Sequence, residues 1–215
     1  SKPPPVMWEW YGDRYMGAAH GVMGITFMLL HVPAMLEGQN LDLLRQTLQW
    51  LATMKQASGN YPVVFGEASA DCIHFCHGAT GAVLLYCKAY EVLQEERWLQ
   101  LAKDAGEVVW KYGLLKKGPG ICHGIAGNGY SFLSLYRVTE DSKWLARAYH
   151  FACQIFAPEV ERQSRCPDNP FSLFEGLAGT LCFLMDLRVR PKAAAFPLFE
   201  LESSRSVAPK RKREP

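Results

Sequence analysis

Apolar residues recur along the middle of the chain in two alternating patterns, and each pattern predicts a helix. The run from Ala82 to Val92 is apolar on nearly every side, which is typical of a helix buried between neighbours. After a polar break, apolar residues return at spacings of three and four from Trp98 to Tyr112, which predicts a helix with one buried face. Together the two segments predict a hairpin of one inner and one outer helix.

This hairpin pattern returns 46 residues later. The offset carries Trp98 onto Trp144, and it also carries the tripeptide Cys76–Gly78 onto Cys122–Gly124. One spacing that relates both a glycine turn and a tryptophan indicates a duplicated unit.

Two looser copies of the turn precede further apolar runs, AHGVMG at residues 19–24 and FEGLAG at residues 174–179. The shared motif is His or Glu, Gly, any two residues and Gly, in which glycine permits a tight turn and close approach of backbones. Strand signals are scarce, and Tyr61–Phe65 is at most a short extended piece. We therefore predict an all-α fold in which hairpins stack into a solenoid or an (α/α) toroid, here a partial ring whose C-terminal end could close against the first helices.

Length and charge change this picture little. The 215 residues suit a single domain, which we assign to residues 1–202, followed by a basic, disordered tail at residues 203–215. The formal net charge is +2, but the tail carries five cations and one anion, so the remainder is slightly acidic. A folded body without excess positive charge predicts no nucleic-acid partner.

The seven cysteines are an odd number in a chain too large to need a disulfide framework. We see no secretory signal at the start and no apolar run long enough to span a membrane. These features predict reduced thiols, a cytoplasmic location and no membrane contact.

In a stack of such hairpins, equivalent turns meet at one mouth of the ring. This places six turn residues near one another: His20, Cys76, His77, Cys122, His123 and Glu175. Among them Cys76, Cys122 and His123 offer two thiolates and one imidazole, which suit zinc. Three protein ligands leave a fourth position open, which is typical of a catalytic zinc site.

Other interpretations of these residues stay open. Free cysteines are commonly small core residues, and His77 and His123 are also suited to capping helices. A rival ligand set is the CxHxC run of Cys72, His74 and Cys76. The remaining helical cysteines are expected in the core: Cys87, Cys153 and Cys182.

Three stretches carry a resemblance to a known family: FCHGATG, GLLKKGPGICHGIAGNGYSFLSLYR and PFSLFEGLAGTLCFL. They resemble the LanC-like proteins, eukaryotic relatives of the bacterial lanthionine cyclases, over a region from about Gly12 to the tail. The resemblance implies a double ring of helices, usually seven inner and seven outer.

The resemblance also implies roles for individual residues. Cys76, Cys122 and His123 match the zinc ligands of the family, and the zinc activates a thiol that adds to dehydroalanine or dehydrobutyrine. His20 matches the histidine assigned to proton transfer, for which an imidazole has a suitable pKa. His77 has no ligand role in the family.

In the LanC-like branch the thiol is that of glutathione. Lys117, Arg165 and Asp168 match family residues that contact it, and cations suit its two carboxylates while Asp suits its amine. Glu175 replaces the Cys-His pair in the last turn, as an acceptor beside the site or as a helix cap.

The chain also departs from the family, because it has four inner-helix signals and about half the family's length. We expect a C-terminal half whose inner helices expose apolar faces, which is less stable than a full ring and leaves catalysis by the short chain open. Two other functions compete with the transferase. One is a non-catalytic protein that binds zinc and glutathione and acts through partners. The other is a toroid glycosidase, which needs paired carboxylates where this chain has only Glu175.

Overall fold

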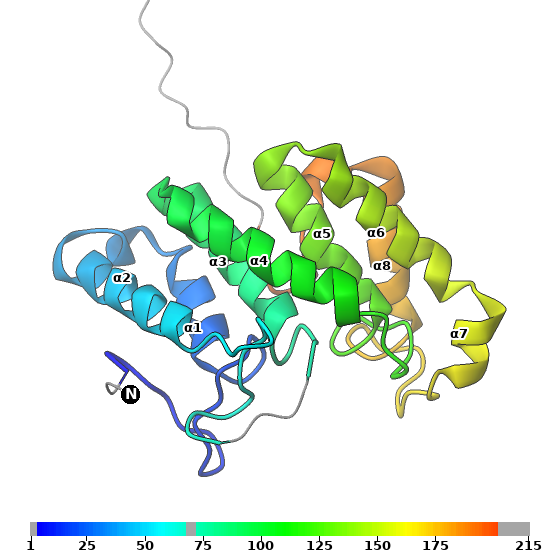
Figure 1. Ribbon diagram of the computed structural model, residues 1–215, viewed down its shortest axis with the longest axis horizontal. Coiled ribbons are helices and arrows are strands. Elements are labelled where there is room, and N and C mark those ends of the chain that lie inside the picture. The colour runs from blue at the N-terminus through cyan, green and yellow to red at the C-terminus, as the bar shows by residue number, and fades with distance from the viewer. Residues whose placement is uncertain (1–3, 68–71, 202–215) are drawn as a thin grey trace, which may run out of the picture.

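The computed structural model describes residues 4–67 and 72–201, and its regular structure is helical (Figure 1). No strand forms in those ranges, and near the predicted extended piece Tyr15 and Val64 make an isolated β-bridge. The all-α prediction is confirmed, while the tail at residues 203–215 lies outside the described residues. In chain order the α-helices are α1 (Val22–Leu29), α2 (Gly38–Thr53), α3 (Ala79–Leu93), α4 (Glu96–Tyr112), α5 (Ile125–Thr139), α6 (Ser142–Ile155), α7 (Pro158–Gln163) and α8 (Leu177–Val189), with short 3₁₀ helices at Pro33–Met35 and Pro191–Ala193.

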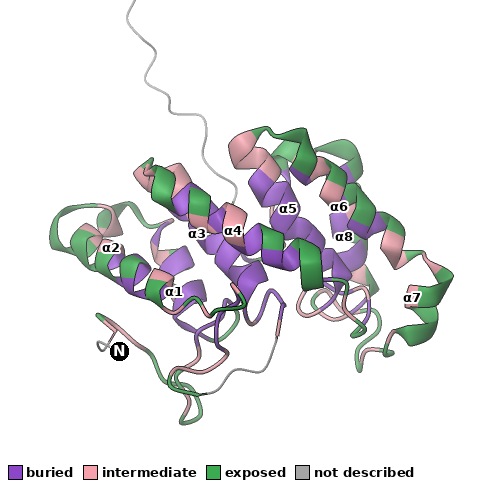
Figure 2. Cartoon of the chain, in the orientation of Figure 1, coloured by how far each residue is buried: buried purple, intermediate pink, exposed green. Residues whose placement is uncertain are grey.

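Four helices, α1, α3, α5 and α8, pack in succession, α1 on α3, α3 on α5 and α5 on α8. Each begins directly after the first glycine of a predicted turn motif. Most of α3 and α5 is buried, whereas α4 and α6 cover them from outside and bury one face each (Figure 2). This is the predicted layering of inner and outer helices.

The internal repeat extends to side-chain contacts. Trp98 of α4 stacks on Tyr86 of α3, with ring centroids 6.0 Å apart, and Trp144 of α6 stacks on Phe132 of α5 at 6.2 Å. Both pairs are buried and are related by the 46-residue offset. Of the three cysteines predicted in the core, Cys87 is buried, Cys182 is half-buried and Cys153 is exposed. Cys153 lies one residue past the buried Ala152, and a helix turns about 100° per residue.

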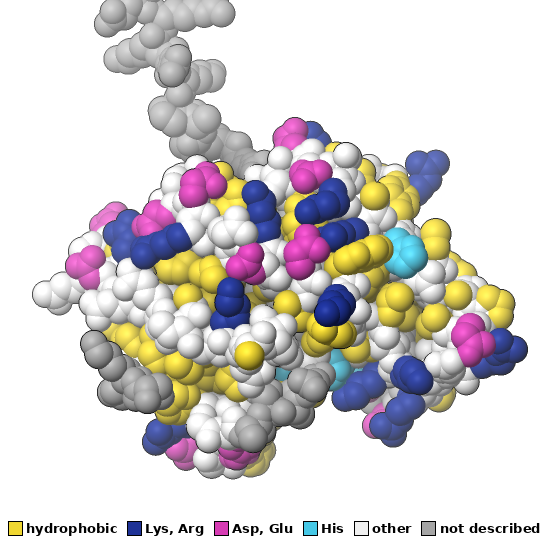
Figure 3. Space-filling view, in the orientation of Figure 1, with side chains coloured by type: hydrophobic (Ala, Val, Ile, Leu, Met, Phe, Trp, Pro, Cys, Tyr) yellow, Lys and Arg dark blue, Asp and Glu magenta, His cyan; other side chains and the backbone are white. Residues whose placement is uncertain are grey.

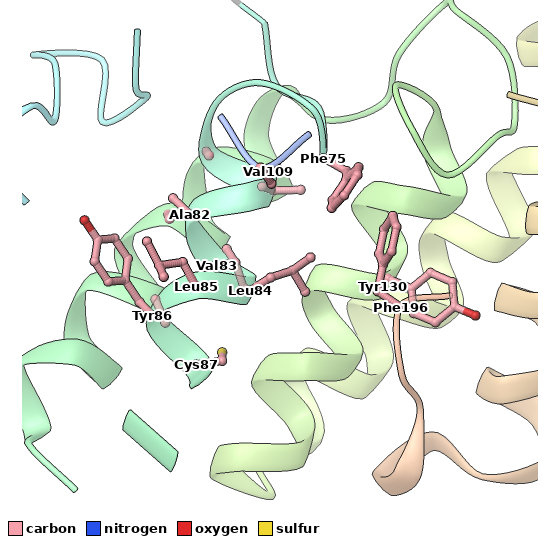
Figure 4. Packing of buried hydrophobic residues seen from close by; sticks show 14 of the residues in the cluster. Phe75, Ala82, Val83, Leu84, Leu85, Tyr86, Cys87, Val109, Tyr130 and Phe196 are labelled. Atoms are coloured by element: carbon pink, nitrogen blue, oxygen red, sulfur yellow. The ribbon is translucent and has the colours of Figure 1, made fainter. Parts of the chain in front are cut away.

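The segment after α8 runs back across the row of inner helices from α8 to α1. Phe196 stacks on Phe75 with centroids 4.1 Å apart and packs beside Tyr130, as Figure 4 shows. Phe199 stacks on Phe27 of α1 at 4.2 Å. The C-terminal segment therefore reaches the first inner helix, and it does so through aromatic packing under the loop that precedes α3.

The surface carries mixed charge on the face of the outer helices, where acidic and basic side chains are interspersed (Figure 3). Glu107 of α4 pairs with both Lys143 and Arg147 of α6, which ties neighbouring outer helices together. No helix among the described residues is both long enough and apolar enough to cross a bilayer. One apolar stripe is exposed on α8, at Leu177, Leu181, Met185 and Val189.

Candidate metal centre

In α1 and α5 the backbone of the preceding turn satisfies the first N–H groups of the helix, whereas the first N–H of α3 donates to the Asn60 side chain at 2.8 Å. In α5, the amides of Ile125–Gly127 donate to the carbonyls of Gly118–Gly120 at 3.1–3.3 Å, and α1 repeats this pattern seven residues back along its own chain. The N-cap residue of α1, α3, α5 and α8 is a glycine of the motif, which makes no side-chain cap bond. The alternative that His77, His123 or Glu175 caps a helix is therefore wrong.

The second glycine of the motif is needed for close backbone approach, as predicted. A Cβ atom built on Gly127 would lie 1.9 Å from the carbonyl oxygen of Ile121, and one on Gly24 would lie 1.9 Å from that of Ala18. A contact that short excludes any side chain. The turn residues just before each inner helix are thereby folded back tightly onto the helix.

Backbone hydrogen bonds then join successive turns into a ladder at one end of the arc. Ala19 N–H donates to the Cys76 carbonyl at 3.5 Å, Cys76 N–H to the Cys122 carbonyl at 3.2 Å, and Cys122 N–H to the Phe174 carbonyl at 2.7 Å. Each of these residues directly precedes the His or Glu of its motif. The predicted meeting of equivalent turns at one mouth is confirmed for these four turns.

This ladder brings three potential metal ligands together. One ligand atom each from Cys76, Cys122 and His123 lies within 4.8 Å of the other two. Ligands of a tetrahedral zinc ion are separated by roughly 3.5 Å, given bonds of 2.0–2.3 Å, so small side-chain movements suffice to hold a dication. Cys76 is buried and the other two are half-buried, which leaves one side open to solvent. Neither Cys72 nor His74 joins this group in the described part of the chain.

The electrostatics of the three side chains favour an anionic sulfur at Cys122. The Cys76 thiol donates a hydrogen bond that lowers the pKa of Cys122, and the His123 ring lowers it further. The same bond, together with burial, raises the pKa of Cys76, while the bond to Cys122 raises the pKa of His123. A dication held by Cys76, Cys122 and His123 would require both sulfurs as thiolates and the imidazole neutral.

His20 lies beside this centre and outside the ligand group. Its exposed ring stacks on Trp10, with centroids 4.3 Å apart and planes 18° apart. It also lies 6.0 Å from the ring of His77, whose buried Nδ1 has no hydrogen-bond partner among the described residues. Trp10 therefore positions an imidazole at the rim of the mouth, facing solvent.

Two buried asparagines hold the Cys76 loop in place, and sequence reasoning missed both. Asn128 of α5 donates to the carbonyls of Ile73 at 3.0 Å and Gly113 at 2.8 Å. Asn60 donates to the Cys72 carbonyl at 3.0 Å and accepts from Ala79 N–H at 2.8 Å. An amide inside the apolar run around Asn128 was a signal that could have revealed the first of them.

The residues predicted to contact glutathione line one cavity of about 120 Å³ that adjoins the centre. Lys117, Arg165 and Asp168 share it with the ligand His123 and with Glu175. Arg165 N–H donates to the carbonyl of Lys116 at 2.9 Å, which joins the loop before α5 to the loop before α8. The structure thus places two cations and two carboxylates next to the potential metal ligands.

Comparison with known proteins gives three findings. Residues 2–201 match the family described as lanthionine synthetase C-like protein. A relative from Danio rerio named glutathione S-transferase LANCL1 is 44% identical over 201 residues, which cover 92% of this chain and 48% of the relative. The solved structure of nisin cyclase is 18% identical with a TM-score of 0.68, over 81% of this chain and 46% of that one, which shows a shared fold. The chain spans about half the length of both proteins.

Proposed function

The chain belongs to the lanthionine synthetase C-like family, and from this premise we propose that it takes part in zinc-dependent addition of glutathione to dehydroalanine or dehydrobutyrine residues. The observation that carries the proposal is the group of Cys76, Cys122 and His123 beside a charged cavity. The name of the Danio rerio relative supports glutathione as the thiol. The seven free cysteines fit a reducing compartment such as the cytoplasm.

The chemistry explains why these residue types are required. A free thiol has a pKa of roughly 8.5 and is mostly protonated at neutral pH, and zinc bound at the centre would hold it as the more nucleophilic thiolate. Three protein ligands leave room for that sulfur. Its addition to the β-carbon leaves the α-carbon in need of a proton, and His20 at the rim of the mouth is the residue we assign to supply it.

The adjoining cavity suits one end of glutathione. Lys117 and Arg165 provide positive charge for carboxylates, and Asp168 provides an acceptor for the amine. A volume of about 120 Å³ is below the roughly 300–1,000 Å³ of typical ligand pockets, so the cavity encloses part of the tripeptide and leaves the thiol free to reach the centre.

The test begins with elemental analysis for zinc in the wild type, in Cys122→Ala, and in Cys153→Ala as a matched control with an exposed cysteine outside the centre. We expect one zinc per chain in the wild type and the control, and little in Cys122→Ala. Equal zinc in all three proteins would refute the site.

Activity is then measured by mass spectrometry of a dehydroalanine peptide incubated with glutathione. We expect the adduct with wild-type protein, and bound zinc without adduct for His20→Asn. Zinc and glutathione binding without any adduct in the wild type would instead support the alternative, a non-catalytic binding protein.

A further inference from the structure

His74 is a buried imidazole that the proposed reaction leaves without a role. Only 5% of its surface is exposed, and its Nδ1 lies 3.8 Å from the sulfur of Cys76, within hydrogen-bond range for sulfur. Its ring also lies 6.0 Å from that of His123. His74 therefore lies next to two of the three potential metal ligands, Cys76 and His123, on the buried side of the group.

Three hydrogen bonds fix the backbone of the loop around His74, so the position of its ring is defined. Asn60 binds the carbonyl of Cys72, Asn128 binds that of Ile73, and His74 N–H donates to the His77 carbonyl at 2.9 Å. A side chain on a loop clamped in this way is preorganised for one partner.

The geometry favours a donor over a fourth ligand. The group of ligand atoms that lie within 4.8 Å of one another excludes His74. A thiolate sulfur offers only acceptor positions, so a contact to Nδ1 requires the hydrogen on that nitrogen.

We propose that His74 is a positioning residue that donates its Nδ1 hydrogen to the Cys76 sulfur and so keeps Cys76 a fixed ligand while an incoming thiol reacts. This inference rests on the proposed zinc site. With two ligand thiolates and a third sulfur arriving, negative charge accumulates at the centre. A hydrogen bond to one ligand sulfur withdraws part of that charge and fixes its orientation.

Two substitutions distinguish the effect of the hydrogen-bond donor from that of the size of the ring. His74→Leu replaces the ring with an apolar side chain of similar size and removes the donor, whereas His74→Asn keeps a donor at the place of Nδ1. The control is His31→Leu, which removes a half-buried imidazole whose Nδ1 lies 3.0 Å from the Phe27 carbonyl in α1, outside the candidate metal centre. All four proteins, wild type included, are loaded with cobalt(II) for absorption spectroscopy and with zinc for chelator competition.

In His74→Leu we expect the sulfur-to-cobalt charge-transfer band to move to longer wavelength, because a sulfur without the hydrogen bond gives up its electron more easily. We also expect zinc affinity to fall by about 10–100-fold. His74→Asn restores most of both properties, and His31→Leu leaves both unchanged.

An unchanged band and affinity in His74→Leu would overturn the role of His74 while leaving the zinc site intact. Failure of the wild type to bind either metal would instead overturn the proposed function. If His74→Leu does not fold, His74→Asn is compared with His74→Gln, whose amide reaches one bond too far. Equal spectra for these two variants would then contradict the proposal.

Discussion

At the scale of single residues, the position of the Cys76 sulfur depends on buried amides that contact no ligand atom. Asn128 is fully buried in α5, yet it donates to two loop carbonyls and accepts from Thr80 Oγ1 at 2.6 Å. It thus joins the loop of one hairpin to the inner helix of the next. The group of Cys76, Cys122 and His123 spans the same junction, so its geometry depends on this side chain.

We predict that Asn128→Leu lowers the free energy of unfolding by about 3 kcal/mol, because three buried polar groups lose their partner. It should also weaken zinc binding by releasing the Cys76 loop. Urea unfolding and chelator competition measure the two effects. Asn40→Leu is the control, since Asn40 is exposed and donates to the nearby Ala34 carbonyl. Equal losses in both variants would contradict the role assigned to Asn128.

At the scale of elements, α8 differs from the other inner helices because only one of its faces is covered. Phe183 is fully buried and packs against Gly129 of α5, where an added Cβ would lie 2.3 Å from its ring. Leu181, two residues earlier, is 49% exposed within the apolar stripe of α8. Exposed apolar surface on the inner layer agrees with the expectation for a partial ring.

We predict that Phe183→Ala lowers the free energy of unfolding by about 3–5 kcal/mol, because it leaves a cavity against α5. Leu181→Ala on the same helix should change it by no more than about 0.5 kcal/mol, since little packing is lost. Chemical denaturation of the two variants makes the comparison. A large loss in Leu181→Ala would show that the stripe is covered in the protein in solution.

At the scale of the whole molecule, the segment after α8 contacts several of the inner helices and so links them to one another. In addition to the aromatic contacts of this segment, its Glu200 forms an ion pair with Arg137 of α5. Arg137 also pairs with Glu91 of α3. Phe196 packs against Phe75, the residue directly before Cys76. The last described residues therefore pack against the loop that carries Cys76, a member of the candidate metal centre.

We predict that Phe196→Ala lowers the free energy of unfolding by about 3–5 kcal/mol and the melting temperature by roughly 10 °C. Because Phe75 loses its stacking partner, zinc affinity should also fall. Phe171→Ala serves as the control, since Phe171 is 80% exposed. Calorimetry and chelator competition test both effects, and an unchanged zinc affinity in a destabilised Phe196→Ala would separate the segment from the centre.

The amino-acid sequence by itself determined the helical hairpins, their starts after the motif glycines and the meeting of the turns that carry Cys76, Cys122 and His123. These features follow from local periodicity and from a repeat that returns equivalent residues to equivalent places. Only the tertiary structure decided that Asn128 clamps the neighbouring loop, that His74 lies behind Cys76 and that Phe196 returns beneath it. Such contacts depend on distances between chain segments and on the partners that burial demands for polar groups, and neither is written in the spacing of residues along the chain.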